Sequence, residues 1–375
     1  MAVPKVCGIE TEYGISRRGG RDANPVVASS VLINAYVADR RIGWDFEDET
    51  PARDARGFQR DPSNPPEVET HLVNAVLTNG ARYYVDHAHP EYSTPECIDA
   101  RSALLADKAG ERILAESMGL ARRTLDPGEE IVVYKNNSDG KSNSYGCHEN
   151  YLVDRSTPFG EIVRTMLPWF VTRQIFCGAG KVGAEHERDA VDFQISARAD
   201  FFEEEVGLET TLKRPLVNTR DEPHALPAEY RRLHVIVGDA NLCEVATLLK
   251  VGTTAIVLAM VEDGAIDRDL SIVGPVNAVR TVSRDLTCRA TLERRTGGTA
   301  GATNDAAFYV IRCLARKATG TVTLTNMLVD YTGEHQAAWN ATLVASGGTI
   351  VAQVTGALNN NVSWYVTYQI VEGGA

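Results

Sequence analysis

Alternation of apolar and polar positions predicts short strands through the first 290 residues. Over residues 5–15, Val6, Gly8, Glu10 and Glu12 fall on one face under the period-two rule for strands. Similar runs predict strands over residues 82–85, 130–135, 149–153, 201–208 and 232–237. Apolar residues at helical spacing predict helices over residues 24–38, 100–117, 158–172 and 243–261. The mixture indicates an α+β fold.

Two further segments have a different pattern. Residues 43–66 hold four prolines, many charges and little apolar periodicity, which predicts a long exposed loop. After residue 293, charge falls and Gly and Thr become frequent. Val362, Trp364, Val366, Tyr368 and Ile370 alternate with other residues there. We therefore expect a small all-β domain over residues 303–375, joined to the first 292 residues by a linker over residues 293–302.

Composition narrows the class of protein. A formal net charge of −12 argues against a general nucleic-acid partner, which would need a basic face. No stretch looks long and apolar enough to span a bilayer, and no apolar run follows the N-terminus as in a secretory signal, so we expect no membrane partner. The seven cysteines include no pair at zinc-site spacing and suggest no disulfide framework. A reducing cytoplasm fits this usage.

Paired carboxylates are the first candidate for chemistry. Glu10 and Glu12 share a strand face, where like charges are costly unless a cation neutralises them. Mg²⁺ prefers carboxylates together with phosphate oxygens and water. An edge strand with both glutamates in solvent explains the same pattern equally well.

Histidines and carboxylates also crowd into residues 86–96. Asp86, His87, His89, Glu91 and Glu96 suggest metal binding or acid–base chemistry. A polar loop with solvated histidines is the alternative. The His-x-His spacing also occurs in metallohydrolases, so the cluster alone does not select a metal.

A third group lies farther along the chain. His148 and Asn150 share a strand face, and basic residues gather at Lys213, Arg214, Arg220, Arg231 and Arg232. Such arginines suit a phosphate or carboxylate, although solvated surface arginines are commoner. The GAGKVG run at residues 178–183 matches a dinucleotide motif, but it lacks the surrounding strand and helix, so we interpret it as a loop.

Several collinear segments together resemble the Dop/PafA family, bacterial enzymes that remove or attach the protein modifier Pup. They are GIETEYGI (8–15), LTNGARYYVDHAHPEYS (77–93), YGCHENY (145–151), VGLETTLKR (206–214), NTRDEPH (218–224) and HVIVGDAN (234–241). The resemblance extends over residues 5–292. DHAHP at 86–90 and the loop at 43–66 resemble the depupylase branch.

The resemblance implies a glutamine-synthetase-like cradle, the antiparallel sheet of carboxylate–amine ligases, that holds ATP (or ADP) and Mg²⁺. The implied nucleotide residues are Glu10, Tyr84, Arg198 and Arg220. The implied metal ligands are Glu10, Glu91, His148 and His234, and the implied catalytic residue is Asp86. Strict alternation along a single strand would place Asp86 and Glu91 on opposite faces, and a break at Pro90 is the expected remedy.

The implied partners are Pup and pupylated proteins, and the implied reaction is hydrolysis of the amide between the C-terminal glutamate of Pup and a lysine, or deamidation of a C-terminal glutamine. Asp86 would attack the carbonyl or activate water, and both routes stay open. An acidic Pup would follow a basic track, for which the candidates are Lys213, Arg214, Arg231 and Arg232.

Three other functions remain open at this point. They are a Pup ligase or another carboxylate–amine ligase, a non-catalytic module that binds Pup or nucleotide, and a zinc amidohydrolase using His87 and His89. Beyond residue 293 the sequence no longer resembles the family, whose members continue with more helices. A fusion, a truncated or frame-shifted gene and a remodelled phage-borne enzyme each explain this tail. Self-association through the tail is one expected role.

Overall fold

The structure is a computed structural model that describes residues 1–20, 24–38, 40–43, 53–57, 73–186, 188–211 and 213–284 in full, and the strands between residues 290 and 366 by their backbone. The chain divides into two compact units, residues 1–284 and residues 285–375. The predicted loop at 43–66 therefore lies mostly outside the described residues.

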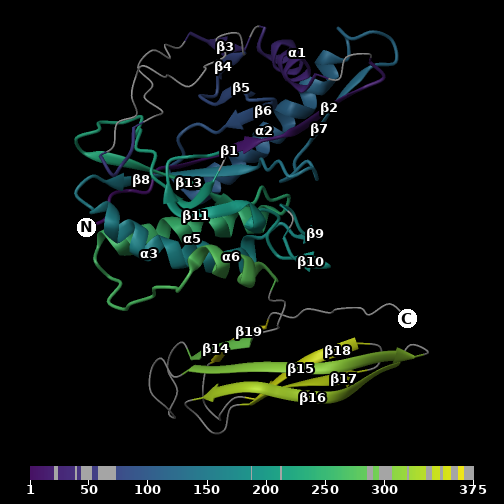
Figure 1. The fold of residues 1–375 in the computed structure, drawn as a ribbon, viewed down its shortest axis with the longest axis vertical. Coiled ribbons are helices and arrows are strands. Elements are labelled where there is room, and N and C mark those ends of the chain that lie inside the picture. Colours follow the sequence, from purple (N-terminus) through teal and green to yellow (C-terminus); the bar gives the residue numbers. More distant parts are fainter. Residues whose placement is uncertain are drawn as a thin grey trace. The chain divides into compact units, whose positions relative to one another are not determined.

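A seven-stranded sheet organises the first unit, in the order β13-β8-β1-β6-β5-β4-β3 (Figure 1). Every neighbouring pair in it is antiparallel. Its strands are β1 (Cys7–Glu12), β3 (Arg41–Ile42), β4 (Asn74–Leu77), β5 (Arg82–Asp86), β6 (His89–Ser93), β8 (Cys147–Asp154) and β13 (Tyr230–Gly238). The large antiparallel sheet that the family resemblance implied is confirmed.

Smaller sheets flank the large one. β2 pairs with β7, β9 pairs with β10, and β11 runs parallel to β12. Their bounds are β2 (Gly14–Arg18), β7 (Glu130–Tyr134), β9 (Lys181–Val182), β10 (Phe193–Gln194), β11 (Phe202–Gly207) and β12 (Arg214–Asn218). β9, a strand of only two residues, falls within the GAGKVG run, where a dinucleotide fold would have a helix.

Some helices contact strands of the large sheet directly, and others pack against those helices or against one another. The helices are α1 (Pro25–Val37), α2 (Ala100–Ala121), α3 (Phe159–Thr172), α4 (Gln174–Cys177), α5 (Glu244–Glu262) and α6 (Pro275–Arg284). Capping residues explain where the first two begin. Asn24 accepts from the amides of Val26 and Val27, and Asp99 forms a reciprocal capping box with Ser102.

Strand alternation separates an apolar face from a polar face. Ile9, Tyr151 and Leu233 point to the helices and belong to the main apolar core. Glu10, His148 and other polar residues alternate with them and are only partly buried. The polar face therefore carries titratable groups from several strands at once.

The hairpin of β5 and β6 differs from the expectation for residues 86–91. Asp86 pairs with His89, and Tyr84 pairs with Glu91, so the chain turns at residues 87 and 88 rather than breaking at Pro90. Because residues directly opposite on antiparallel strands share a face, the turn brings Asp86 and Glu91 to the same side. Pro90 lies within β6. Because proline has no N–H, it cannot donate a backbone hydrogen bond to β1, and β1 ends at Glu12.

α5 corrects the expectation that no segment is long and apolar enough to cross a membrane. The helix has 19 residues, and an 18-residue window within it has a mean hydropathy of 1.7, so it is long and apolar enough to cross a membrane by length and composition alone. Core helices meet the same criteria, and α5 packs against α2, α3, α4 and β8. On its inner face Lys250 is fully buried and donates to the carbonyl of Asp239 at 2.6 Å.

The second unit contains the predicted alternating segments as strands. They are β14 (Ala290–Arg294), β15 (Ala306–Ala318), β16 (Thr321–Glu334), β17 (Asn340–Ser346), β18 (Thr349–Thr355) and β19 (Val362–Val366). β14 pairs with β15 and β19, so residues 293 and 294, predicted as linker, lie in a strand. The described residues do not include the rest of the predicted linker, Tyr368 or Ile370.

Candidate active site

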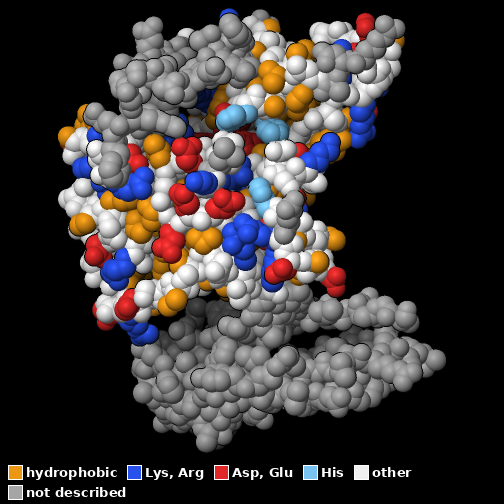
Figure 2. All heavy atoms as spheres, in the orientation of Figure 1, with side chains coloured by type: hydrophobic (Ala, Val, Ile, Leu, Met, Phe, Trp, Pro, Cys, Tyr) orange, Lys and Arg blue, Asp and Glu red, His pale blue; other side chains and the backbone are white. Residues whose placement is uncertain are grey.

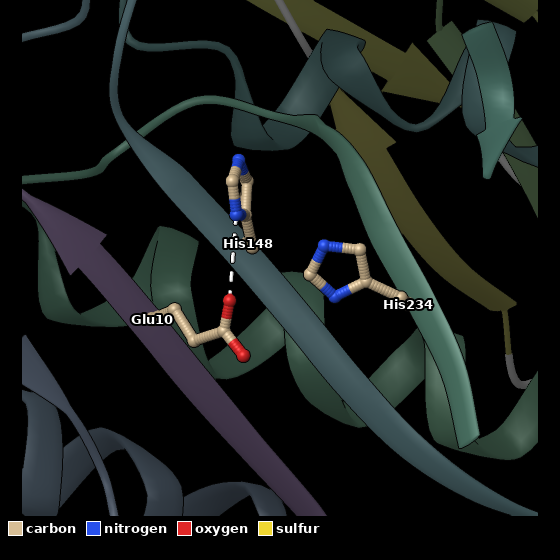
Figure 3. A group of neighbouring side chains, drawn as sticks. All are labelled: Glu10, His148 and His234. Atoms are coloured by element: carbon tan, nitrogen blue, oxygen red, sulfur yellow. Dashed lines mark ion pairs between the residues drawn. The ribbon is translucent and has the colours of Figure 1, made fainter. Parts of the chain in front are cut away.

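Glu10, His148 and His234 meet on the polar face of the sheet (Figure 3). The register places Glu10 of β1 opposite His148 of β8, and β13 brings His234 beside them. One ligand atom from each lies within 4.8 Å of the others. His148 Nδ1 is 3.4 Å from Glu10 Oε2, and the two imidazole centroids are 5.1 Å apart. Three of the four predicted metal ligands therefore form one cluster.

Asn150 fixes the orientation of this cluster. Its Nδ2 donates to Glu10 Oε1 at 2.8 Å, and its Oδ1 lies 2.9 Å from His234 Nδ1. Since an amide oxygen only accepts, His234 donates through Nδ1. Its Nε2 is therefore unprotonated and carries a lone pair. That Nε2 is buried and has no hydrogen-bond partner. An orphaned acceptor beside a carboxylate is what a bound cation would satisfy.

The charge states in the cluster suit a cation. Burial holds the pKa of His234 well below its ordinary value, so the ring is neutral at neutral pH. Burial opposes ionisation of Glu10, but the neighbouring imidazoles and Arg232 outweigh it, so its pKa lies well below the usual range. For Glu10 we give most weight to Arg232 and His148, because a neutral His234 adds little positive charge. The result is an ionised carboxylate beside a neutral His234.

A second cluster contains Glu12, Asp86 and Glu91, whose ligand oxygens also lie within 4.8 Å of one another. Burial, and then the charges of the neighbouring carboxylates, raises the pKa of Glu91 well above its ordinary value. Tyr84, one of the predicted nucleotide residues, donates its hydroxyl to Glu91 Oε1 at 2.6 Å. Three oxygens in one place are the donor set that Mg²⁺ prefers, so these residues fit that ion.

Asp86 is accessible to solvent, with 37% of its side chain exposed. His87 Nδ1 lies 3.1 Å from Asp86 Oδ1. Burial raises the pKa of Asp86, but the hydrogen bond and charge of His87 outweigh it and lower the pKa below its ordinary value. His87 has a φ of 52°, a left-handed conformation that costs energy in a non-glycine residue. An ionised, accessible carboxylate suits attack or proton abstraction.

The two predicted phosphate arginines lie in different environments. Arg198 is 1% exposed, and its Nη1 donates to the carbonyls of Ile236 at 2.9 Å and Gly238 at 2.6 Å. It therefore ties the end of β13 in place, and its predicted phosphate contact stays a prediction. Arg220 is 28% exposed, and its Nε lies 3.8 Å from Glu222 Oε2, at the border of the first cluster.

The structure does not place the predicted basic track on one surface. Arg231 and Arg232 are consecutive on β13 and point to opposite faces, so both cannot line one groove. Arg231 is buried, with its guanidinium 5.3 Å from the ring centroid of Phe159. Arg232 lies 3.6 Å from Glu10, and only Lys213 among the four candidates is exposed. As a continuous track the prediction is wrong.

Two residues were left out of the predicted site. Asn150 was noted only for sharing a face with His148, and Glu12 was paired with Glu10 as a candidate for cation binding but was not among the site residues that the family resemblance implies. The amide of Gly146 donates to Glu12 Oε2 at 2.9 Å, which fixes that carboxylate beside Asp86.

In the space-filling view, histidines lie among acidic and basic side chains near the middle of the polar face (Figure 2).

Replacing Asn150 by alanine should weaken magnesium-nucleotide binding by about 10- to 100-fold, the usual cost of removing a residue that orients a ligand. The reason is that His234 loses the acceptor that fixes its tautomer, and Glu10 loses a donor. Calorimetric titration with magnesium-ADP measures the effect. Asn143→Ala is the control, because Asn143 is exposed and its side chain bonds only Asp139. Equal affinities in the two variants would contradict the role of Asn150.

Comparisons with known proteins show the family of this chain. The family model described as Pup-ligase protein matches residues 5–374. The chain belongs to the Pup-ligase protein family. The match extends beyond residue 292, so the expectation that the sequence no longer resembles the family after residue 293 is wrong.

Curated relatives of this Pup-ligase family member fall into two groups. A depupylase of Acidothermus cellulolyticus is 59% identical over 305 residues, which cover 78% of this chain and 60% of that protein. A Pup deamidase/depupylase of Mycolicibacterium smegmatis is 50% identical over 299 residues, which cover 77% of this chain and 60% of that protein. A Pup–protein ligase of Actinosynnema mirum is 43% identical over 375 residues, which cover 98% of this chain and 74% of that protein. The chain thus spans about 60% of the length of the depupylases.

Two solved structures support the same fold. The ligase PafA in complex with Pup superposes with a TM-score of 0.60 at 34% identity, over 75% of this chain and 51% of that one. PafA in complex with ADP gives a TM-score of 0.51 at 38% identity, over 66% of this chain and 53% of that one. The mixed α/β fold with a large antiparallel sheet is therefore the fold of this Pup-ligase family member.

Proposed function

We propose that the chain is an ATP-dependent depupylase and Pup deamidase. It would hydrolyse the isopeptide bond between the C-terminal glutamate of Pup and a substrate lysine, and deamidate a C-terminal glutamine of Pup. The observation that carries the proposal is the pair of clusters, Glu10–His148–His234 and Glu12–Asp86–Glu91, on one polar face. The aligned depupylase is also more similar in sequence than the aligned ligase, at 59% against 43% identity.

The proposed cofactors are Mg²⁺ and ATP or ADP, held in a cradle like that of glutamine synthetase. Glu10, His148, His234 and Glu91 would hold the metal, and Tyr84 and Arg220 would border the nucleotide. The orphaned Nε2 of His234, the raised pKa of Glu91 and the solved ADP complex of PafA support this assignment. We also propose a cytoplasmic location, supported by the five described cysteines, which are all free thiols.

Asp86 would perform the central step. Its ionised carboxylate either attacks the amide carbonyl to give an anhydride, or takes a proton from the attacking water. His87 keeps that carboxylate ionised and oriented. Bound magnesium nucleotide would supply positive charge for the developing oxyanion. The leaving group is a lysine amine from a conjugate, or ammonia from a C-terminal glutamine.

Incubation of the purified chain with a Pup-conjugated protein tests the proposal. We expect conjugate loss on a gel and appearance of free Pup when ATP and Mg²⁺ are present. Addition of a chelator should stop the reaction, and addition of excess Mg²⁺ should restore it. Intact conjugate after hours, with nucleotide bound, would contradict the proposal and favour a binding module.

A Pup ligase is the second candidate, favoured by the alignment that covers 98% of the chain. A ligase would release ADP stoichiometrically while it forms conjugate from Pup and a target protein, whereas a depupylase should not. A zinc amidohydrolase finds less support. Among the residues that the structure describes, His87 and His89 belong to neither metal-ligand cluster, and His89 instead stacks on Tyr145 at 4.3 Å between ring centroids.

A further inference from the structure

Cys7 and Cys97 lie directly opposite each other on neighbouring extended segments. The amide of Cys7 donates to the carbonyl of Cys97, and the amide of Cys97 donates to the carbonyl of Cys7, each at 2.8 Å. Such a reciprocal pair is the hydrogen-bonded pair of an antiparallel ladder, in which the Cα atoms lie about 5.5 Å apart. That spacing matches the commonest Cα separation of disulfides, about 5.5–6 Å.

The two side chains share one environment. Both residues are buried, at 3% and 5% exposure, and both belong to the apolar core on the helix side of the sheet. Both are free thiols, and Cys97 donates to the carbonyl of Pro95 at 3.1 Å. Burial, and secondly the neighbouring Cys97, raises the pKa of Cys7 to about 12. Burial also raises the pKa of Cys97, so both thiols are protonated at neutral pH.

The pair sits at an irregularity in the sheet. The β1–β6 ladder pairs Glu10 with Ser93, and Thr94 continues it by donating to the carbonyl of Ile9 at 2.9 Å. The pairing of Cys7 with Cys97 is shifted by one residue from that register. The amide of Ile9 donates to the hydroxyl of Thr94 at 3.0 Å instead of to a backbone carbonyl, as expected for a bulge. Bulges end regular pairing and place unusual residues opposite each other.

We propose that Cys7 and Cys97 form a reversible intramolecular disulfide by exchange with a low-molecular-weight disulfide such as oxidised glutathione. One cysteine thiolate attacks the small disulfide, forms a mixed disulfide and releases one thiol. The second cysteine attacks the protein sulfur of the mixed disulfide and releases the other thiol. Two protein thiols are oxidised, one small disulfide is reduced to two thiols, and the two protein protons pass to the departing thiolates.

The bond would join the strand that carries Glu10 to the segment that follows the strand of Glu91. It would stop these strands from separating at the bulge, so hydrogen exchange of the Thr94 amide should become slower. Because the attacking species is the thiolate, formation should be faster at pH 9 than at pH 7.

Peptide mapping of the full chain tests the proposal. The native protein is incubated with oxidised glutathione, blocked with N-ethylmaleimide and digested with trypsin without reduction. We expect residues 6–17 and 83–101, each holding a single cysteine, to appear as one linked peptide that dithiothreitol separates. Formation of the bond should lower the intact mass by about 2 Da, the mass of the two thiol hydrogens. Any glutathione attached to another cysteine as a mixed disulfide adds its own mass and is counted separately.

Matched variants define the result. Cys243→Ser removes an exposed thiol and should leave the linked peptide unchanged, whereas Cys97→Ser should abolish it. Separate peptides from the wild-type chain, under conditions in which Cys243 is glutathionylated, would overturn the proposal, as would a link from Cys7 to another cysteine. The mapping uses the wild-type chain, so the folding of the variants does not decide it. The outcome is also independent of the proposed function.

Discussion

Replacing Asp86 by asparagine is expected to lower the rate of Pup-conjugate cleavage by about 10³-fold or more, within the range lost when a nucleophile or general base is removed. Asparagine keeps the shape of the side chain but neither attacks a carbonyl nor takes a proton. Gel densitometry of conjugate loss under saturating ATP and Mg²⁺ measures the effect.

Magnesium-nucleotide affinity should change little in Asp86→Asn, because the proposed metal ligands Glu10, Glu91, His148 and His234 all remain and asparagine keeps an oxygen at position 86. Asp269→Asn is a suitable control, since Asp269 is exposed and bonds only Ser271. A rate in Asp86→Asn close to that of the control would contradict the catalytic assignment. Loss of nucleotide binding together with loss of the rate would show instead that Asp86 helps to hold the metal.

Replacing Glu149 by leucine is expected to lower the free energy of unfolding by about 3–5 kcal/mol, the cost of leaving a buried charge without its partner. Glu149 is fully buried, and Arg173 donates to both of its carboxylate oxygens, at 2.6 and 2.7 Å. Burial raises the pKa of Glu149, but the charge of Arg173 outweighs it and lowers the pKa below its ordinary value. The stabilisation is therefore present at neutral pH and lost as the pH falls through the folded-state pKa.

Urea unfolding of the whole chain, followed at neutral pH, measures this effect. Glu161→Leu is the matched control, because the pair of Glu161 with Arg164 is about half exposed and should contribute less than about 1 kcal/mol. The double variant Glu149→Leu/Arg173→Met should recover part of the loss, since it leaves no unpaired guanidinium, but the buried ammonium of Lys250 still loses the charge of Glu149. Equal unfolding midpoints for Glu149→Leu and Glu161→Leu would contradict the buried ion pair.

Within single strands, the sequence predicted the polar face well. Glu10 and Glu12 share a face because side chains alternate along β1, and His148 and Asn150 share one along β8 for the same reason. Alternation says nothing of which strands pair. The meeting of Glu10 with His234, 224 positions later, depends on the register of β1, β8 and β13 and came only from the family resemblance.

The failures have equally specific causes. Asp86 and Glu91 were treated as parts of one strand, although a two-residue turn between β5 and β6 resets the alternation. Arg231 and Arg232 were grouped by charge, although consecutive strand residues point to opposite faces. The apolar character of residues 243–261 predicted a helix correctly. The expectation that no segment is apolar enough to cross a membrane is wrong for this helix, whose 18-residue apolar window includes the buried Lys250.

Titration of magnesium-ATP into the purified chain by calorimetry most directly tests whether the two clusters hold a magnesium nucleotide. We predict one saturable binding event per chain that requires Mg²⁺ and is lost in His234→Ala, which removes the orphaned Nε2. A folded protein, verified by circular dichroism, that shows no binding of magnesium nucleotide would contradict the proposed site and, with it, the proposed ATP-dependent hydrolysis.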